Sequence, residues 1–566
     1  MTRCIKANRR RANRRRWIAF ILCLTLCGIP AEAFVYGQER PRNENRREKV
    51  RLVLGIVIDQ FRYDYLTRFE DLFGEGGFRR LLREGAVFTN ANYTYTPTVT
   101  ACGHATFMSG SLPSQHGIVG NEWFDRKANR EVTSVSDERV KMLGGQGMRP
   151  ASPSRLIGST FGDQLRLANS GASKVVGIAL KDRSAILPAG KNANGAFWFD
   201  TSNGVFVSST YYFPDLPLWV KRFNQTNRPD RYFGAKWQRL MPKAAYERSL
   251  PDDSPYEQSP WGKTFPYIIN GGEKKPGKQF YDQFDETPFA NEYTAAFAKA
   301  AIEGERLGQD DETDLLTVSF SANDGLGHRF GPYSQEVQDM TLRTDRVLAD
   351  LFNYVEQKIG LAKTIVVLTA DHGVAPLAEH AWDVGLGGGR MPTKDITQAV
   401  QSALSERLGP EQGVLHTISG NVYFDYNVIA RKGADRSELE RLGCEAAVKV
   451  EGVADCLSRT QLLSGQLLPG SISSHVLNGF YAERNGDLII TLKPYYMHRT
   501  GTGTTHGTPY SYDTHVPIIF LGRKVAAGNY ANASNPSDIA PTLAALLKLE
   551  PPSNSTGRIL TEAIKF

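Results

Sequence analysis

The stretch Thr364-Ile-Val-Val-Leu-Thr-Ala-Asp-His-Gly373 joins an apolar run to two potential metal ligands, Asp371 and His372. The apolar run is short and rich in β-branched residues, a pattern typical of a buried β-strand. In an open α/β sheet, ligands bind at the edge formed by the carboxyl ends of the strands. The stretch therefore predicts a buried strand that brings a carboxylate and an imidazole to such an edge.

Two other apolar runs end in the same way. Leu52-Val-Leu-Gly-Ile-Val-Ile-Asp59 ends in an aspartate, and so does Leu315-Leu-Thr-Val-Ser-Phe-Ser-Ala-Asn-Asp324, which is followed four residues later by His328. Near-continuous apolar strands are typical of a sheet that is covered on both faces. We expect the three acidic ends to meet along one edge of the sheet.

Helical patterns alternate with these strands along the chain. Further strands are expected at Val175–Leu180, Leu488–Leu492 and Val516–Leu521. Helices are expected at Phe289–Leu307, Gln335–Ile359, Arg436–Val450 and Ser537–Leu549. Alternating strands and helices predict an α/β fold with a doubly wound central sheet flanked by helices.

The N-terminal segment has the pattern of a secretory signal peptide. A basic region is followed by an apolar stretch from Trp17 to Pro30 and by the cleavage-site pattern Ala31-Glu-Ala33. Arg14-Arg15-Arg16-Trp17 is also compatible with the twin-arginine route. An uncleaved membrane anchor is the alternative, but the apolar stretch is short for that role.

The net charge of +7 arises in this leader. The first 33 residues contain eight basic residues and one acidic residue, so the remainder has 59 of each kind. A nearly neutral remainder gives no indication of a nucleic-acid partner. We expect a periplasmic or secreted protein, monomeric and without a stable membrane partner.

Composition also suggests a domain arrangement. Residues 1–33 form the signal peptide, the charge-rich residues 34–49 a flexible tether, and residues 50–550 one catalytic domain with two insertions. The first insertion, at about 181–272, is rich in Trp, Tyr, Phe and Pro; we expect a hairpin turning at Asn203-Gly204 and a cap over the sheet edge. The alternative is an ordinary β-rich insertion that covers core, and the two are compatible. The second, at 395–480, has less distinctive features.

Three cysteines follow the leader. Cys444 and Cys456 are close enough in sequence to close a small loop in an oxidising compartment, and we predict a disulfide between them. Cys102 is then the unpaired thiol and is expected to be packed rather than reactive.

The acidic and imidazole residues at the strand ends suit Zn²⁺. Asp59, Asp371 and His372 provide three ligands for one ion, while Asp324 and His328 provide two for another. The second ion needs a third ligand. His506, in the loop Gly501-Thr-Gly-Thr-Thr-His506-Gly before the Val516 strand, is the best candidate, and His498 and His515 compete with it. The remaining histidines lack such acidic partners and are expected to be structural: His104, His116, His380, His416 and His475.

A nucleophile is expected where the extended, Thr-rich stretch Tyr93-Thr-Tyr-Thr-Pro-Thr-Val-Thr100 runs into small residues and a helix. A hydroxyl at the first turn of that helix lies at its positive end, where an anion is favoured. Thr100 is our candidate, and coordination to Zn²⁺ can activate its hydroxyl. The stretch could instead be a Thr-rich strand without chemistry.

In order and spacing, these residues resemble the alkaline phosphatase superfamily, in the branch of nucleotide pyrophosphatases/phosphodiesterases and secreted PafA-type alkaline phosphatases. The resemblance covers roughly residues 50–550. It also rests on four further segments: Pro113-Ser-Gln-His-Gly-Ile-Val-Gly-Asn121, Phe320 to His328, Tyr512-Asp-Thr-His-Val-Pro517 and Asp538-Ile-Ala-Pro-Thr-Leu. It implies two Zn²⁺ per chain, one with Asp59, Thr100, Asp371 and His372, the other with Asp324, His328 and His506.

The resemblance also indicates how phosphate is bound. PafA-type phosphatases carry a Lys-x-Arg pair and an asparagine that contact phosphate; Lys181-Asp-Arg183 and Asn121 match them. Strand alternation would place Lys181 and Arg183 on one side of the chain. A solvated strand end is the alternative.

Lys181 and Arg183 favour phosphate monoesters over diesters, because a dianionic phosphoryl group needs cationic partners. The prediction is a hydrolase, a two-zinc alkaline phosphatase that cleaves small-molecule phosphate monoesters through a phosphothreonine intermediate. The alternative is a phosphodiesterase or nucleotide pyrophosphatase with the same zinc site. A binding protein without catalysis is a third possibility, although no expected ligand is missing.

Overall fold

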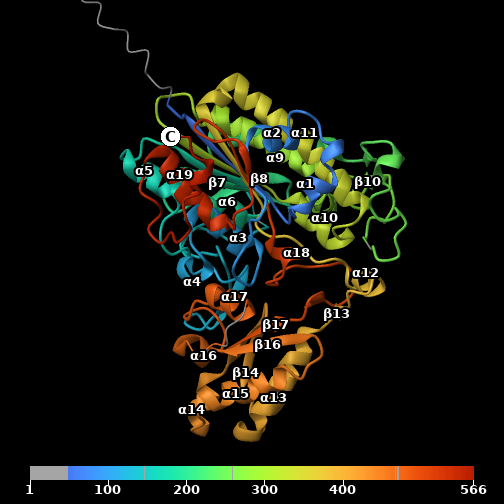
Figure 1. Cartoon of the computed structure of the whole chain (residues 1–566), viewed down its shortest axis with the longest axis vertical. Coiled ribbons are helices and arrows are strands. Elements are labelled where there is room, and N and C mark those ends of the chain that lie inside the picture. The colour runs from blue at the N-terminus through green and yellow to red at the C-terminus, as the bar shows by residue number, and fades with distance from the viewer. Residues whose placement is uncertain (1–48, 146, 258, 466, 468–470, 566) are drawn as a thin grey trace, which may run out of the picture. The chain divides into compact units, whose positions relative to one another are not determined.

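A computed structural model of the protein describes residues 49–145, 147–257, 259–465, 467 and 471–565. The predicted signal peptide and nearly all of the predicted tether lie outside these residues. The described chain from Lys49 onward consists of a large body built on a central sheet and a smaller lobe, residues 393–492, which Figure 1 shows below the body. Among the described residues, no helix combines the length and hydrophobicity needed to cross a membrane.

The central sheet has ten strands in the described part of the chain. In spatial order they are β20 (Gly528–Tyr530), β2 (Ala86–Phe88), β19 (Ile518–Gly522), β12 (Thr364–Thr369), β1 (Leu52–Ile58), β11 (Asp314–Phe320), β6 (Val175–Ala179), β7 (Gly195–Asp200), β8 (Val205–Ser209) and β5 (Met142–Leu143). The middle of the sheet, from β12 to β7, is parallel. β19 runs antiparallel to β12, so the sheet is mixed.

Helices cover both faces of this sheet, as predicted (Figure 1). One face packs against α2 (Phe78–Glu84), α9 (Pro288–Gly304), α10 (Ala322–Phe330) and α11 (Gln335–Lys358). The other packs against α3 (Thr100–Ser109), α5 (Phe161–Ala168), α6 (Asp182–Ala189) and α19 (Ile539–Leu547). Strand alternation explains the two cores: Leu54 and Ile56 of β1 belong to the first, and Val53 and Val57 to the second.

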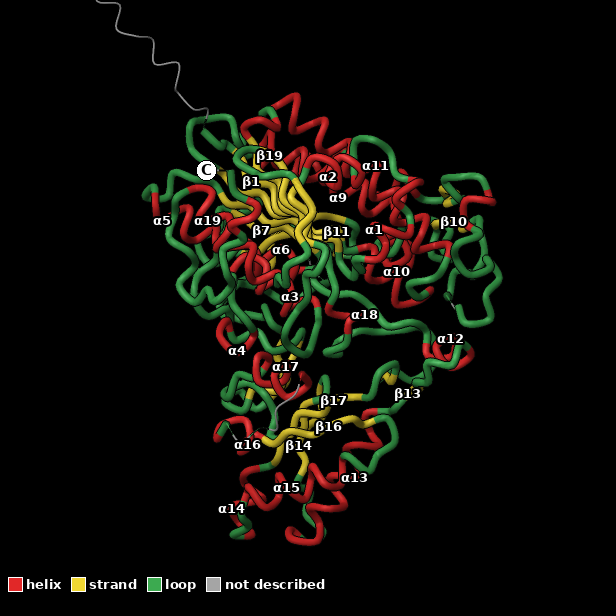
Figure 2. Tube along the Cα trace, viewed as in Figure 1, coloured by secondary structure: helices red, strands yellow, loops and turns green. Residues whose placement is uncertain are grey.

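The small lobe has its own sheet and its own core (Figure 2). Its strands, in spatial order, are β14 (Val414–Ile418), β15 (Asn421–Phe424), β17 (Leu488–Leu492) and β16 (Val453–Ser458). Its helices are α13 (Thr393–Leu408), α14 (Tyr426–Lys432), α15 (Arg436–Ala447), α16 (Arg459–Ser464) and α17 (Ser471–Gly479). The predicted disulfide is present between Cys444 of α15 and Cys456 of β16. Cys102 is a buried free cysteine, as expected.

The first predicted insertion is not a separate unit. Its hairpin is confirmed, with the turn at Asn203-Gly204, but β7 and β8 extend the central sheet. Beyond them, α7 (Leu218–Thr226) packs against α9, and β9 (Ala235–Trp237) pairs with β10 (Tyr267–Ile269) outside the sheet. The other elements used below are α4 (Pro113–His116), α8 (Lys278–Phe284), β13 (Gly389–Arg390), β18 (Tyr496–Met497) and α18 (Ser511–Thr514).

Candidate active site

Strand register brings the predicted ligands together. β1 pairs in parallel with both β11 and β12, with Ile58 opposite Phe320 and Val57 opposite Thr369, so the three strands end at one edge. Asp59 follows β1, Asp371 and His372 follow β12, and Asp324 lies in the first turn of α10, just after β11. β19 begins at this same edge because its antiparallel register places Ile518 opposite Thr369.

The first cluster consists of Asp59, Asp371 and His372, all completely or almost completely buried. The Nε2 atom of His372 lies 3.5 Å from Asp59 Oδ1 and 3.4 Å from Asp371 Oδ2. Both of these carboxylate oxygens are buried without a hydrogen-bond partner among the described residues. Buried polar atoms normally have partners, so this group fits a bound cation.

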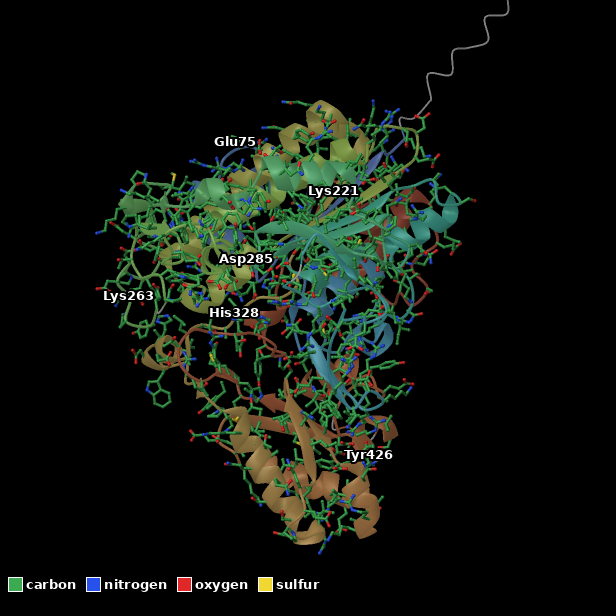
Figure 3. The ribbon with its side chains drawn as sticks, turned by 180° about the vertical axis from the view of Figure 1, so that it is seen from behind. Glu75, Lys221, Lys263, Asp285, His328 and Tyr426 are labelled. Carbon is green, nitrogen blue, oxygen red and sulfur yellow. A yellow bond between two sulfur atoms is a disulfide. The ribbon has the colours of Figure 1, made fainter. Side chains whose placement is uncertain are left out.

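The second cluster is centred on Asp324. Its Oδ1 atom lies 3.2 Å from His328 Nε2 and 3.5 Å from His506 Nε2. The rings of His506 and His372 stack with their centroids 3.5 Å apart, so the two clusters adjoin. In Figure 3, the labelled His328 lies on the side of the body that faces the small lobe, where Tyr426 is labelled.

All three imidazoles are oriented by the main chain. The Nδ1 atom of His372 lies 2.9 Å from the carbonyl oxygen of Gly373, that of His328 lies 2.7 Å from Thr504, and that of His506 lies 2.8 Å from Thr98. A carbonyl only accepts, so each Nδ1 carries a proton, and each Nε2 faces the carboxylates. Metal-bound histidines usually have this arrangement.

The loop that holds His506 is anchored by Asp513 of α18. Its Oδ2 atom accepts hydrogen bonds from the backbone of Gly507 and from the backbone and hydroxyl of Thr508. Burial raises the pKa of Asp513 to about 6. These bonds fix the loop beside the sheet edge and hold the imidazole of His506 near Asp324.

The electrostatics of the site also favour cations. Burial raises the pKa of Asp59 well above its ordinary value, and the carboxylates of Asp371 and Asp324 raise it further. Burial lowers the pKa of His372 to about 3, so this imidazole is neutral and able to act as a ligand. Three carboxylates in a buried space require positive charge. The donor set of carboxylates and imidazoles fits two divalent ions, and Zn²⁺ suits it well.

Lys181 supplies part of that charge. Its ammonium donates to Asp59 Oδ2 at 2.7 Å and to Asp324 Oδ2 at 2.6 Å, thus bridging the two clusters. Burial alone would lower the pKa of Lys181, but the attraction of Asp324 and Asp59 outweighs it, and the net shift is upward.

The local structure predicted for this segment was wrong. β6 ends at Ala179, Lys181 is the N-cap of α6, and Arg183 lies in the first turn of that helix, so strand alternation does not relate the two side chains. The Arg183 guanidinium lies 3.7 Å from the carboxylate of Asp182, and its Nε atom is buried without a hydrogen-bond partner among the described residues. This leaves donor capacity for an anion.

Thr100 is the first residue of α3, as predicted, and is 1% exposed. Its Oγ1 atom lies 3.5 Å from His372 Nε2, beside both clusters. The side-chain oxygen of Asn121 accepts a hydrogen bond from the backbone of Ala101, which orients the carboxamide at the start of the helix. The positive end of α3 thus combines a hydroxyl, an amide and the metal-ligand clusters at one place.

Comparison with known proteins agrees with this geometry. The family described as type I phosphodiesterase/nucleotide pyrophosphatase matches residues 53–515. The chain belongs to this family.

Similar proteins include alkaline phosphatase PhoV of Synechococcus elongatus, which is 39% identical over 91% of this chain and 93% of PhoV. Alkaline phosphatase PafA of Elizabethkingia meningoseptica is 39% identical over 94% of this chain and 97% of PafA. The crystal structure of PafA covers 91% of this chain and 99% of its own, with a TM-score of 0.86 and 38% identity. The structure of a PafA variant also matches, with a TM-score of 0.84. In this variant a threonine is replaced by serine, and an asparagine, a lysine and an arginine are each replaced by alanine.

In this member of the family, Gln60, which was not predicted from the sequence, supports two of the proposed ligands. Gln60 donates from its backbone to Asp371 Oδ1 at 3.1 Å and from its side chain to Asp324 Oδ1 at 2.6 Å. It has a φ of 60°, an uncommon conformation for a non-glycine residue. A Cβ at Gly327 would lie 1.9 Å from the Gln60 amide oxygen, so a larger residue there would displace the Gln60 side chain. The sequence signal for Gln60 is only its position after Asp59.

His104 was expected to be structural, but it contacts a metal-ligand candidate. Its Nδ1 atom lies 2.9 Å from the carbonyl oxygen of Thr100 and 3.3 Å from Asp371 Oδ2. His104 follows Thr100 by one helical turn, and this spacing could have identified it. The side chain therefore links the nucleophile candidate to a carboxylate of the first cluster.

Of the histidines that competed for the third position, His506 is the one that reaches Asp324. His515 stacks on Tyr63, and its Nε2 atom lies 2.9 Å from the carbonyl oxygen of Thr89. His498 lines a cavity beside the site. His515 therefore has a structural role.

Proposed function

We propose that this protein is a secreted alkaline phosphatase that hydrolyses phosphate monoesters with two zinc ions. The observation that carries the proposal is the convergence of Thr100 with three carboxylates and three Nε2-directed imidazoles at one sheet edge. The names of PhoV and PafA, which align over more than nine-tenths of the chain, support the activity.

Two ions would be held by the two clusters. Asp59, Asp371 and His372 would hold one beside Thr100, and Asp324, His328 and His506 would hold the other. Bound divalent cations in such a pair supply Lewis-acid charge that stabilises the attacking and leaving oxygens of a phosphoryl transfer. The mixture of carboxylate and imidazole ligands supports zinc over the oxygen-preferring Mg²⁺ and Ca²⁺.

The protein residues then perform a two-step transfer. Thr100 Oγ1 attacks phosphorus, the bond to the leaving oxygen breaks, and the proton lost by the hydroxyl ends on the leaving alcohol. Water hydrolyses the phosphothreonine, releasing phosphate and restoring the hydroxyl. Thr100 lies at the positive end of the α3 dipole, which favours the anionic phosphoryl group. Asn121, fixed by its bond to Ala101, is placed to donate to a non-bridging oxygen.

Lys181 and Arg183 support monoester specificity. A monoester dianion carries more charge than a diester, and both cations belong to the site edge: Lys181 contacts Asp59 and Asp324, and Arg183 has unused donors. In the PafA variant, the substituted threonine and asparagine are 21 positions apart, as are Thr100 and Asn121. The substituted lysine and arginine are two apart, as are Lys181 and Arg183.

The experiment compares p-nitrophenyl phosphate with bis-p-nitrophenyl phosphate on one preparation. Replacing both Lys181 and Arg183 by alanine should lower kcat/KM for the monoester by at least about 10²-fold, since one lost charge-assisted contact already costs about 2.7–4 kcal/mol. The diester should lose less than about tenfold. Lys191→Ala, just after α6, is the matched control. Equal losses on both esters would refute the assigned role, and faster native turnover of the diester would favour the phosphodiesterase alternative.

Localisation and assembly complete the proposal. The sequence pattern of residues 1–33 supports export to the periplasm or medium through a cleaved signal peptide. We further propose a monomer that acts on small-molecule esters, without a nucleic-acid or stable membrane partner. The mass and N-terminal sequence of the mature protein, with its sedimentation, would test these points.

A further inference from the structure

A cavity of about 340 Å³ lies beside the site and is walled by both parts of the molecule. The large body contributes Asn121, His328 and His506, which are all site residues. The small lobe contributes the turn between β14 and β15 and the strand β17, with β18 of the connecting segment beside them. Figure 1 shows this lobe opposite the sheet edge. No described residue of the aromatic-rich segment 181–272 lines the cavity.

The position of the cavity indicates which part of a phosphate monoester would occupy it. His328 and His506 of the second cluster border the cavity, and His506 also stacks on His372, which lies beside Thr100. The group esterified to that phosphate must leave the sheet edge in some direction. The cavity provides the space, and its volume is within the range of about 300–1,000 Å³ typical of small-molecule sites.

The chemistry of the lining is unusually uniform. Among the described residues that line the cavity there is no Asp, Glu, Lys or Arg. Aliphatic side chains such as Val476, Ile490 and Leu492 alternate with the carboxamides of Asn421 and Asn485 and several threonines. A charged leaving group would lose hydration here without gaining a counter-charge, which is costly. The lining therefore favours an uncharged group.

His498 belongs to the cavity wall, but its ring nitrogens are shielded from the cavity in the structure and would reach a ligand only if the imidazole turned. Both of its ring nitrogens are buried without a hydrogen-bond partner among the described residues. A Cβ at Gly420, which also lines the cavity, would lie 4.0 Å from His498 Nε2, so the residue opposite the imidazole is small. Burial lowers the pKa of His498 to about 4, and a neutral imidazole offers one donor and one acceptor.

We propose that this cavity is the leaving-group site, that it selects uncharged hydroxyl-bearing alcohols of about nucleoside size, and that His498 is a specificity-determining residue that hydrogen-bonds them. The inference rests on the proposed phosphatase function and deepens it. A ligand group that pairs with His498 satisfies a buried polar atom, and this makes the contact worth more than one exposed to water.

Three phosphate monoesters test the proposal. Adenosine 5′-monophosphate has an uncharged leaving group that fills the cavity, methyl phosphate has one too small to reach it, and 3-phosphoglycerate has one with a carboxylate. For the native enzyme, kcat/KM should be at least about tenfold higher for adenosine monophosphate than for 3-phosphoglycerate. His498→Ala should lower the value for adenosine monophosphate about tenfold, mainly through KM, and change methyl phosphate less than about twofold. His416→Ala, at a histidine of the same lobe outside the cavity lining, is the control.

A second variant tests the lining independently of His498. Thr393 lines the cavity at the start of α13, so Thr393→Lys places a cation in it. The ratio of kcat/KM for 3-phosphoglycerate over adenosine monophosphate should then rise about tenfold.

The proposal fails if His498→Ala slows methyl phosphate as much as adenosine monophosphate, or if the native enzyme shows no preference between the large substrates. It also fails if Thr393→Lys leaves their ratio unchanged. The proposed function itself fails by a different result, namely no hydrolysis of methyl phosphate or of any other monoester by the native protein.

Discussion

Replacing Gly103 by alanine should separate the nucleophile from the metal-ligand clusters. Helix α3 passes so close to β12's end that a Cβ at Gly103 would lie 2.3 Å from the carbonyl oxygen of Asp371 and 2.6 Å from its Cα and Cβ. Carbon atoms in contact are normally about 3.5–4.0 Å apart, so the helix and Asp371 must move apart by roughly 1 Å. These three Asp371 atoms are part of the backbone or bonded directly to it, so a side-chain rotation cannot relieve the contacts.

The two effects of this shift have different sizes. Overpacking of this kind costs about 1–3 kcal/mol of folding free energy, which a domain of this size can tolerate. A displacement of about 1 Å in a catalytic group lowers the rate about 10²-fold. We therefore expect a folded Gly103→Ala protein whose kcat for p-nitrophenyl phosphate is reduced about 10²-fold.

The assay measures kcat, the melting temperature and bound zinc on the same preparation. Gly74→Ala is the control, because the nearest atom to its new Cβ would be Asp345 Oδ2 at 3.4 Å, an ordinary contact. It should keep nearly native activity. If Gly103→Ala stays within about threefold of the native kcat, the close approach of α3 does not position Thr100, and the reasoning is wrong.

Two further predictions concern charge. Chelation of the bound metal should abolish activity and lower the melting temperature, because Lys181 alone would then balance three buried carboxylates; full activity with less than one metal ion per chain would contradict the two-cluster site. Burial raises the pKa of Glu257 above its ordinary 4.5, and Glu336 raises it further. The native protein thus holds the Glu257 proton more tightly than the unfolded chain does. The stability that this protonated carboxyl contributes is complete below pH 4.5, the ordinary pKa, and is lost as the pH rises through the folded pKa. Glu257→Gln should accordingly raise the melting temperature at about pH 9 and leave it nearly unchanged at about pH 5. A variant that melts at a lower temperature than the native protein at pH 9 would mean that the carboxylate is needed in its ionised form.

The convergence of most of the proposed ligands could be predicted from the sequence because they follow from local patterns, whereas His506 lies in a loop and had two competing histidines. Asp59 and Asp371 come at the ends of apolar strands, and parallel pairing places such ends together. Asp324 and His328 are four residues apart at the start of a helix, so they share a face. These patterns also predicted the helices on both faces of the sheet.

Contacts between distant segments explain what could not be predicted. Gln60 contacts residues 264 and 311 positions away, and nothing in its surroundings indicates either bond. The start of α6 was missed because Lys181-Asp-Arg183 follows an apolar strand and contains no apolar period of its own. The cap was expected from aromatic composition at 181–272, yet many of those aromatic side chains belong to the main core.

The residues proposed for catalysis and those proposed for leaving-group specificity therefore come largely from different parts of the fold. Most of the proposed ligands and Thr100 lie next to the ends of central strands or in the helices that follow them, and His506 lies in a loop anchored by Asp513. The walls of the cavity come in large part from the small lobe, which has a separate sheet, a separate core and a disulfide. Substitutions on the lobe wall can change the leaving-group pocket without disturbing β1, β11 or β12. Because the lobe has this independence, the leaving group cannot be inferred from the ligand pattern, and it has to be read from the cavity itself.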